Sequence, residues 1–222
     1  MRARLLPILL VLVGCTSFAN VRSAEVRPGP SQTLQVSFTT PPGEAASWFW
    51  SDDCGTQCNR GITAWDLTVA VGRRPTLGPP FTLGVGVTGI LYPYAEAYVQ
   101  LRQHPRNPFG IGGRLGLGVD GWSQHQLYAR FDAPLGPGAR LLFNPGVFYQ
   151  VGNSPNGQNP GSFLGLVGAF GVEMGSGPVA LTPGLAFVRG RAEHRSYGVE
   201  HGPVTQPFVA LSLGLVFRRG RR

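Results

Sequence analysis

The sequence predicts an all-β protein, an antiparallel up-and-down transmembrane β-barrel of about 8 to 10 strands. Between Gly110 and Phe217, large apolar residues alternate with small or charged ones. Several of the alternating segments have the length of about 9–11 residues that a tilted membrane strand needs. No segment combines helical periodicity with capping residues, which leaves strands as the regular structure.

The alternation also predicts which side of the sheet meets lipid. In the last segment, one face is bulky and apolar and the other is mostly small; the bulky residues are Val209, Leu211, Leu213, Leu215 and Phe217. Consecutive side chains of a strand point to opposite sides of the sheet. A soluble barrel would turn the bulky face inward, whereas a barrel in a bilayer turns it outward. We therefore expect apolar side chains outside and small or polar ones inside.

The same pattern marks the strands in order. They are expected at Trp65–Val71, Phe81–Leu91, Ala95–Arg102, Ile111–Val119, Gln126–Asp132, Arg140–Val151, Phe163–Glu173, Val179–Arg189 and Phe208–Phe217. Thr33–Thr39 alternates weakly and is the candidate for a tenth strand. Long connections at Gly152–Gly161 and Gly190–Pro207 are separated by a tight one at Gly175–Pro178, which fits long outer loops and short periplasmic turns.

The amino terminus predicts a signal peptide over residues 1–14. Met1–Arg4 is basic, and Leu5–Val13 is an apolar stretch of nine residues. A helix of this length is too short to cross a hydrocarbon core of about 30 Å.

The leader ends in Leu12-Val13-Gly14-Cys15, which resembles the lipobox of bacterial lipoproteins. The resemblance implies that Cys15 becomes the new amino terminus and carries acyl chains, enough of them to hold the chain to a leaflet. Ser17-Phe18-Ala19 offers the alternative, which is ordinary cleavage after Ala19. Both readings remain open on the sequence.

Three regions follow the leader. Residues 15–32 are polar, contain Pro28-Gly29-Pro30, and are interpreted as a linker. Residues 33–61 are an irregular segment with the candidate first strand, and residues 62–222 are assigned to the barrel. Cys54 and Cys58 lie in the irregular segment, and in an exported protein we expect them to form a disulfide.

Six charged residues of the predicted strands point into the lumen by alternation: Glu96, Arg102, Arg114, Arg130, Asp132 and Glu173. Because unpaired buried charge is very costly, we interpret them as an interior network of ion pairs and hydrogen bonds. A polar pore or a catalytic cluster is the alternative. Ser123, His125 and Glu96 are the nearest equivalents of the residues in barrel enzymes that trim lipid A, but no family motif surrounds them. We predict no enzyme activity, no cofactor and no metal site.

The formal net charge is +8, and the basic residues are arginines scattered along the chain. Without a helix or an aromatic platform beside them, they do not predict nucleic-acid binding. Outer-membrane lipid and lipopolysaccharide phosphates are the expected anionic partners.

Taken together, the chain resembles small outer-membrane barrels of the OmpA/OmpX type joined to a lipoprotein leader. The closing aromatic of such barrels is matched by Phe217. The resemblance implies a bacterial outer membrane location, both lipid-anchored and membrane-spanning, and a structural or surface-interaction role with an unknown envelope or extracellular protein. The loops near Trp48–Arg60, Gly152–Gly161 and Gly190–Pro207 would be presented outside. A narrow channel or lipid-binding barrel is the alternative, followed by an enzyme acting on membrane lipid.

Overall fold

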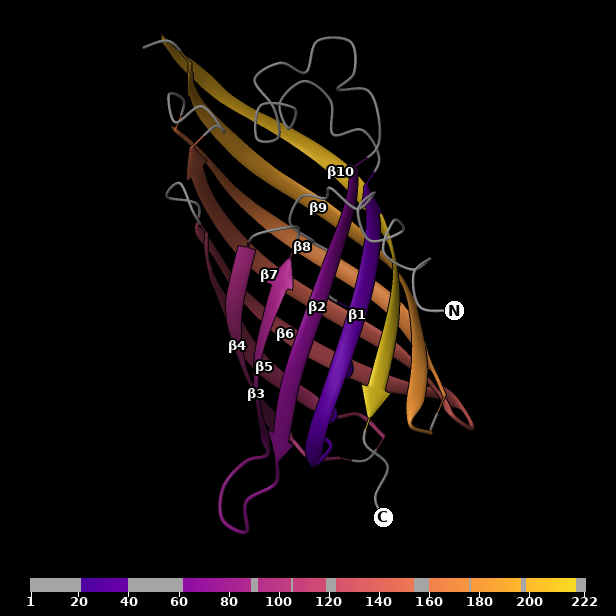
Figure 1. The fold of residues 1–222 in the computed structure, drawn as a ribbon. Coiled ribbons are helices and arrows are strands. Elements are labelled where there is room, and N and C mark those ends of the chain that lie inside the picture. The colour runs from indigo at the N-terminus through magenta and orange to yellow at the C-terminus, as the bar shows by residue number, and fades with distance from the viewer. Residues whose placement is uncertain are drawn as a thin grey trace, which may run out of the picture.

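In the computed structural model, the described residues form ten antiparallel strands that close into a barrel (Figure 1). The structure describes residues 21–39, 62–88, 92–104, 106–118, 123–153, 160–175, 177–196 and 199–218. The predicted fold class is confirmed, with the larger of the expected strand numbers. Among the described residues, no helix is long and apolar enough to cross a bilayer.

Each strand pairs with the next along the chain, and β1 closes the barrel by pairing with β10. The strands are β1 (Gly29–Thr39), β2 (Ile62–Arg73), β3 (Phe81–Thr88), β4 (Tyr92–Arg102), β5 (Phe109–Leu117), β6 (Ser123–Gly136), β7 (Ala139–Asn153), β8 (Pro160–Met174), β9 (Val179–Ser196) and β10 (Val199–Arg218). The weakly alternating segment at Thr33–Thr39 therefore is a strand, and it begins four residues earlier than the sequence indicates.

The exterior of the barrel is apolar, as the alternation predicts. All ten strands expose large apolar side chains, from Leu34 on β1 to Phe217 on β10, and the exposed fraction reaches 72% at Leu127. A continuous apolar belt of this kind is far larger than the patches that soluble monomers show to water. It is the exterior of a barrel that meets lipid.

Two tight turns, β6–β7 and β8–β9, lie at the end of the barrel where the carboxyl terminus lies (Figure 1). Gly138, between β6 and β7, has φ 73°, and Gly175, after β8, has φ 110°. Glycine adopts these positive φ values without steric cost, so the chain can reverse within a few residues. Outer-membrane barrels place such turns in the periplasm, and we call this end periplasmic.

The outer connection between the last two strands differs from the prediction. Gly190–Pro207 was expected to be a loop, but β9 continues to Ser196 and β10 begins at Val199. The register shifts between His201 and Val204. The sequence misses this extension because strands above the lipid have water on both faces, so apolar alternation ends while the pairing continues.

The amino-terminal part of the described chain lies inside the barrel. Val21, Ala24 and Val26 are buried, and residues 21–28 run toward the periplasmic end, where β1 starts at Gly29 with φ 103°. We call residues 21–28 the lumenal segment. The sequence analysis interprets residues 15–32 as a linker. The structure describes residues 21–32 of this range, and they form the lumenal segment and the first residues of β1.

Candidate functional site in the lumen

The lumenal segment is fixed to the barrel wall through its backbone. The N–H of Ala24 donates to Oδ1 of Asp132 at 2.7 Å, and the hydroxyl of Tyr98 donates to the carbonyl of Ala24 at 2.8 Å. The hydroxyl of Ser23 donates a hydrogen bond of 2.6 Å to Oδ2 of Asp132. One carboxylate of β6 and one tyrosine of β4 therefore hold the middle of the segment from two sides.

Wall side chains also bind the backbone on either side of this point. The N–H of Val26 donates to Oε1 of Gln100 at 2.9 Å, and its carbonyl accepts from Nε of Arg74 at 2.8 Å. The side-chain amide of Asn144 donates to the carbonyl of Arg22 at 3.0 Å. Buried backbone groups need such partners, and here the barrel wall supplies them.

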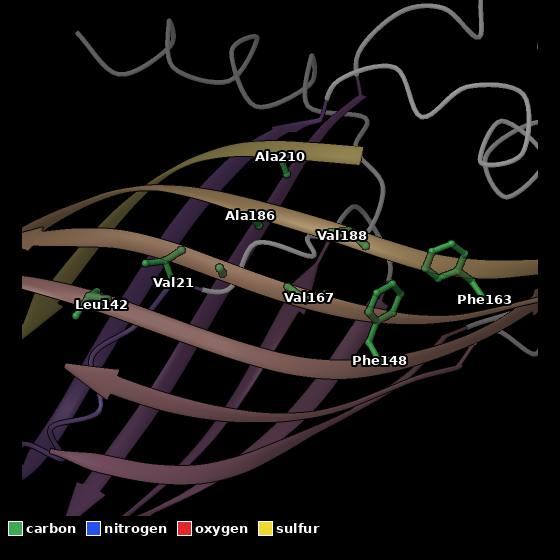
Figure 2. Close-up of a cluster of buried hydrophobic side chains, with 9 residues drawn as sticks. Val21, Leu142, Phe148, Phe163, Val167, Ala186, Val188 and Ala210 are labelled. Carbon is green, nitrogen blue, oxygen red and sulfur yellow. The ribbon is translucent and has the colours of Figure 1, made fainter. Parts of the chain in front are cut away.

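Val21 packs against an apolar half of the lumen. Figure 2 shows it in front of the ribbons of the later strands. The cluster consists of Val21, Leu142, Phe148, Phe163, Val167, Ala169, Ala186, Val188 and Ala210. A Cβ on Gly171 or Gly184 would overlap the methyl groups of Val21. The two glycines therefore make the room that Val21 fills.

The opposite half of the lumen is charged, and Arg22 enters it. Its guanidinium lies 3.1 Å from Oδ1 of Asp66 and 3.1 Å from Oε1 of Glu96. Arg114 reaches the same two carboxylates at 2.8 and 3.2 Å, and Arg130 contacts Glu96 at 2.7 Å. We call these five residues the lumenal ion cluster. They come from the lumenal segment and from β2, β4, β5 and β6.

The cluster holds three guanidinium groups and two carboxylates, so one positive charge is in excess. Burial by itself disfavours the charged form of Arg22, but the combined attraction of Glu96, Tyr94 and Asp66 outweighs it and raises the pKa of Arg22. Two of the guanidinium groups also make cation–π contacts with tyrosine rings. Arg114 lies 3.8 Å from the ring centre of Tyr94, and Arg130 lies 4.6 Å from that of Tyr128.

The tyrosine rings of the lumen lie over glycines of neighbouring strands. A Cβ added to Gly112 would lie 2.8 Å from the ring of Tyr128 and 2.7 Å from the carbonyl oxygen of Ala97. On the outward face of the same strand, a Cβ on Gly113 would meet its nearest atoms only at 3.4 Å. Glycine is therefore required at position 112, on the lumenal side of β5, and merely tolerated at position 113, on the outer side.

We predict that Gly112→Ala lowers the free energy of unfolding by about 1–3 kcal/mol, because the new methyl group displaces the ring of Tyr128. Gly113→Ala, one residue along the same strand, should change it little. Urea unfolding in lipid vesicles measures both. Equal stability of the two variants would contradict the packing described.

A second group of charges lies at the periplasmic mouth. Arg218 contacts Glu173 at 2.6 Å, and Glu25 of the lumenal segment contacts Arg140 at 3.1 Å and Arg74 at 3.5 Å. All of these side chains except Arg140 line a cavity of about 560 Å³, which extends to Arg22, Glu96 and Arg130 of the lumenal ion cluster. The periplasmic mouth is thus wetter and more loosely filled than the centre.

The structure places five of the six predicted lumenal charges inside: Glu96, Arg114, Arg130, Asp132 and Glu173 are all buried. Arg102 differs and is exposed at the end of β4. The register shifts between Gln100 and Arg102, so the simple alternation of sides no longer applies there. Asp66 and Arg22 belong to the site although the sequence analysis did not select them. The alternation Asp66, Thr68, Ala70 in β2 was a usable signal for Asp66, whereas nothing in the polar segment around Arg22 indicated its place.

The catalytic alternative does not assemble. His125 is exposed on the outer face and stacks on Tyr149 with ring centres 6.4 Å apart, whereas Glu96 is buried in the lumen. The barrel wall separates the two side chains. Within the described ranges, no group of three or more His, Cys, Asp or Glu side chains comes together.

Cys15, Cys54 and Cys58 lie outside the described residues, as does the range 48–60. Lipidation and the disulfide therefore stay predictions.

No protein-family model matches the chain, and no curated protein matches it. Among solved structures, it is similar to Neisserial surface protein A, with a TM-score of 0.39, 12% identity, and coverage of 88% of this chain and 99% of that chain. It is also similar to an outer-membrane channel from Pseudomonas putida F1, with a TM-score of 0.37, 12% identity, and coverage of 87% of this chain and 97% of that chain. The Acinetobacter baumannii outer-membrane protein Omp33 is similar with a TM-score of 0.31, 9% identity, and coverage of 89% of this chain and 100% of that chain.

Proposed function

We propose that this chain is a small outer-membrane barrel with a structural or surface-interaction role, and that its lumen is closed by its own amino-terminal segment. The observation that carries the proposal is the insertion of Arg22 between Asp66 and Glu96. A barrel that conducted ions or solutes would need that space. Here it holds paired charges and backbone hydrogen bonds.

Both halves of the lumen support closure. Val21 fills the hollow at Gly171 and Gly184 on the apolar side, and Arg22 fills the charged side. The two residues are consecutive, so a single extended stretch of chain bridges the lumen. A rigid, filled barrel without free strand edges suits a protein that presents its outer parts to a partner.

The outer parts that we propose for presentation include the long hairpin of β9 and β10, which are 18 and 20 residues long. Figure 1 shows these two strands reaching beyond the other strands at the end away from the carboxyl terminus. The segments near Trp48–Arg60 and Gly152–Gly161 are the other candidates. An envelope or extracellular protein would be the partner.

We expect the protein to fractionate with the outer membrane and to migrate faster on gels when unheated than when boiled, because a closed barrel stays compact in detergent. Purified and placed in planar bilayers, it should give no steady ion current. Migration unaffected by heating would contradict the membrane barrel, and steady current from the unaltered chain would contradict closure.

A narrow channel is the second candidate, and one observation favours it. The lumenal segment is held by side chains of the wall and is not a strand of the sheet, since β1 starts only at Gly29. Within the described part of the chain, it is therefore an element of the lumen that can leave without breaking the pairing of the barrel strands. In this case the current would appear only after the segment is displaced.

We also propose that Cys15 is acylated, on the strength of its lipobox-like surroundings. Labelling with radioactive palmitate should be lost in Cys15→Ser and retained in the unaltered chain. Cys15 is six positions before Val21, a stretch that spans at most about 20 Å, so the acylated end would have to reach a leaflet through one of the barrel mouths. An amino terminus found at Asn20 would contradict acylation and establish cleavage after Ala19.

A further inference from the structure

The outward face of β9 changes character abruptly toward its outer end. From Val179 to Phe187 its outward side chains are apolar, and then Arg189 and Arg191 follow on the same face, both exposed. A strand tilted by about 40° rises roughly 25 Å over the ten residue-to-residue steps from Val179 to Arg189. That height equals the apolar band of an outer-membrane barrel. Arg189 therefore lies at the outer boundary of the hydrocarbon.

Arg189 has apolar neighbours on both adjoining strands. It pairs in register with Leu166 on β8 and with Pro207 on β10. Its side chain makes no hydrogen bond or ion pair with any residue in the described ranges. At the edge of a bilayer a guanidinium extends to the headgroup region, where an anionic group from outside the chain is a fitting partner for it.

A groove begins beside Arg189 and extends into the apolar band. It has a volume of about 400 Å³, and Leu166, Gly168, Phe187 and Val209 line it together with Arg189. Gly168 pairs with Phe187 and leaves the outer wall without a side chain at that point. A Cβ at Gly168 would meet only a ring atom of Phe170, at 3.8 Å. The hollow is therefore open space on the lipid side of the wall.

We propose that this surface binds one molecule of lipopolysaccharide, with a phosphate of lipid A against Arg189 and Arg191 and an acyl chain in the groove. Guanidinium and phosphate form charge-assisted, bidentate hydrogen bonds. Arg189 and Arg191 are two residues apart, so their Cα atoms lie about 6.6 Å from each other on the same face of the strand. The occupant must combine negative charge with a long apolar chain and must reside in the outer leaflet, and lipopolysaccharide meets all three conditions. The proposal rests on the outer-membrane location but is independent of lumen closure.

The test uses the purified full-length protein in detergent, with diphosphorylated lipid A as the probe and native mass spectrometry as the readout. We expect one bound lipid per barrel. Arg189→Gln should weaken binding at least about tenfold, as the loss of a charge-assisted contact does. The matched control is Arg73→Gln. Arg73 is also exposed, but it ends β2 at the periplasmic end, so its loss should leave binding unchanged.

A second variant tests the groove separately from the charge. Gly168→Leu fills the hollow without disturbing the lumen, and it should weaken lipid A binding while dephosphorylated lipid A binds poorly to every variant. Equal binding by Arg189→Gln and Arg73→Gln would overturn the proposal. So would displacement of lipid A by inorganic phosphate, or equally tight binding of phosphatidylglycerol. Heat-modifiable migration, which reports the barrel itself, distinguishes these outcomes from failure of the proposed location.

Discussion

Replacing Glu96 by Gln is expected to lower the free energy of unfolding by about 3–5 kcal/mol, the usual effect of removing one member of a buried ion network. Glu96 accepts from all three guanidinium groups of the lumenal ion cluster, those of Arg22, Arg114 and Arg130. The amide would leave three cations facing Asp66 alone. The excess buried charge would rise from one to two. Urea unfolding of the barrel in vesicles measures the loss.

Two variants make this expectation specific. Glu25→Gln changes the same chemical group at the solvated mouth, where Glu25 contacts Arg27, Arg74 and Arg140, and it should cost less than about 1 kcal/mol. Adding Arg22→Met to Glu96→Gln restores the original charge excess and should recover much of the stability. If the double variant were no more stable than Glu96→Gln alone, charge balance would not govern the cluster.

Removing residues 21–28, so that the exported chain continues directly into Gly29, is expected to convert a silent barrel into a conducting one. The segment occupies the centre of the lumen, with Val21 against the apolar half and Arg22 in the charged half. Its loss also removes the middle cation from between Asp66 and Glu96. Planar bilayer recordings should then show steady ion currents.

The control for this deletion is Arg22→Lys, which keeps a cation and the whole backbone of the lumenal segment and should remain silent. Heat-modifiable migration shows whether the shortened barrel is folded. A folded but silent deletion variant would mean that the wall side chains, such as Arg114 and Arg130, close the lumen without help. That result would strengthen the structural role and eliminate the channel alternative.

The architecture was predictable because one physical rule governs every strand. Apolar residues such as Leu127 and Leu213 alternate with polar or small residues such as Gln126 and Ser212. Residues two positions apart in a strand lie on the same face of the sheet. The sides of Glu96, Arg114 and Arg130 follow from that rule alone. The rule fails for Arg102, because the register shift after Gln100 interrupts the alternation of sides.

The site was less predictable because its central member is not on a strand. Arg22 lies in a polar, proline-containing stretch whose composition is that of a linker, and only contacts with residues 44 and 74 positions later give it a place. The outer parts of β9 and β10 were missed for a related reason. Once a strand leaves the lipid, its pairing is decided by its neighbour and no longer leaves a trace in hydropathy.

Val21 stands within a wall that the pairing of β1 with β10 seals. The sheet therefore encloses the start of the described chain on all sides. If an export leader were still joined to the chain when β1 pairs with β10, the sheet would close around its attachment point. For a chain made with such a leader, we would expect proteolytic removal of the leader to precede closure, and the peptidase would then take part in barrel assembly.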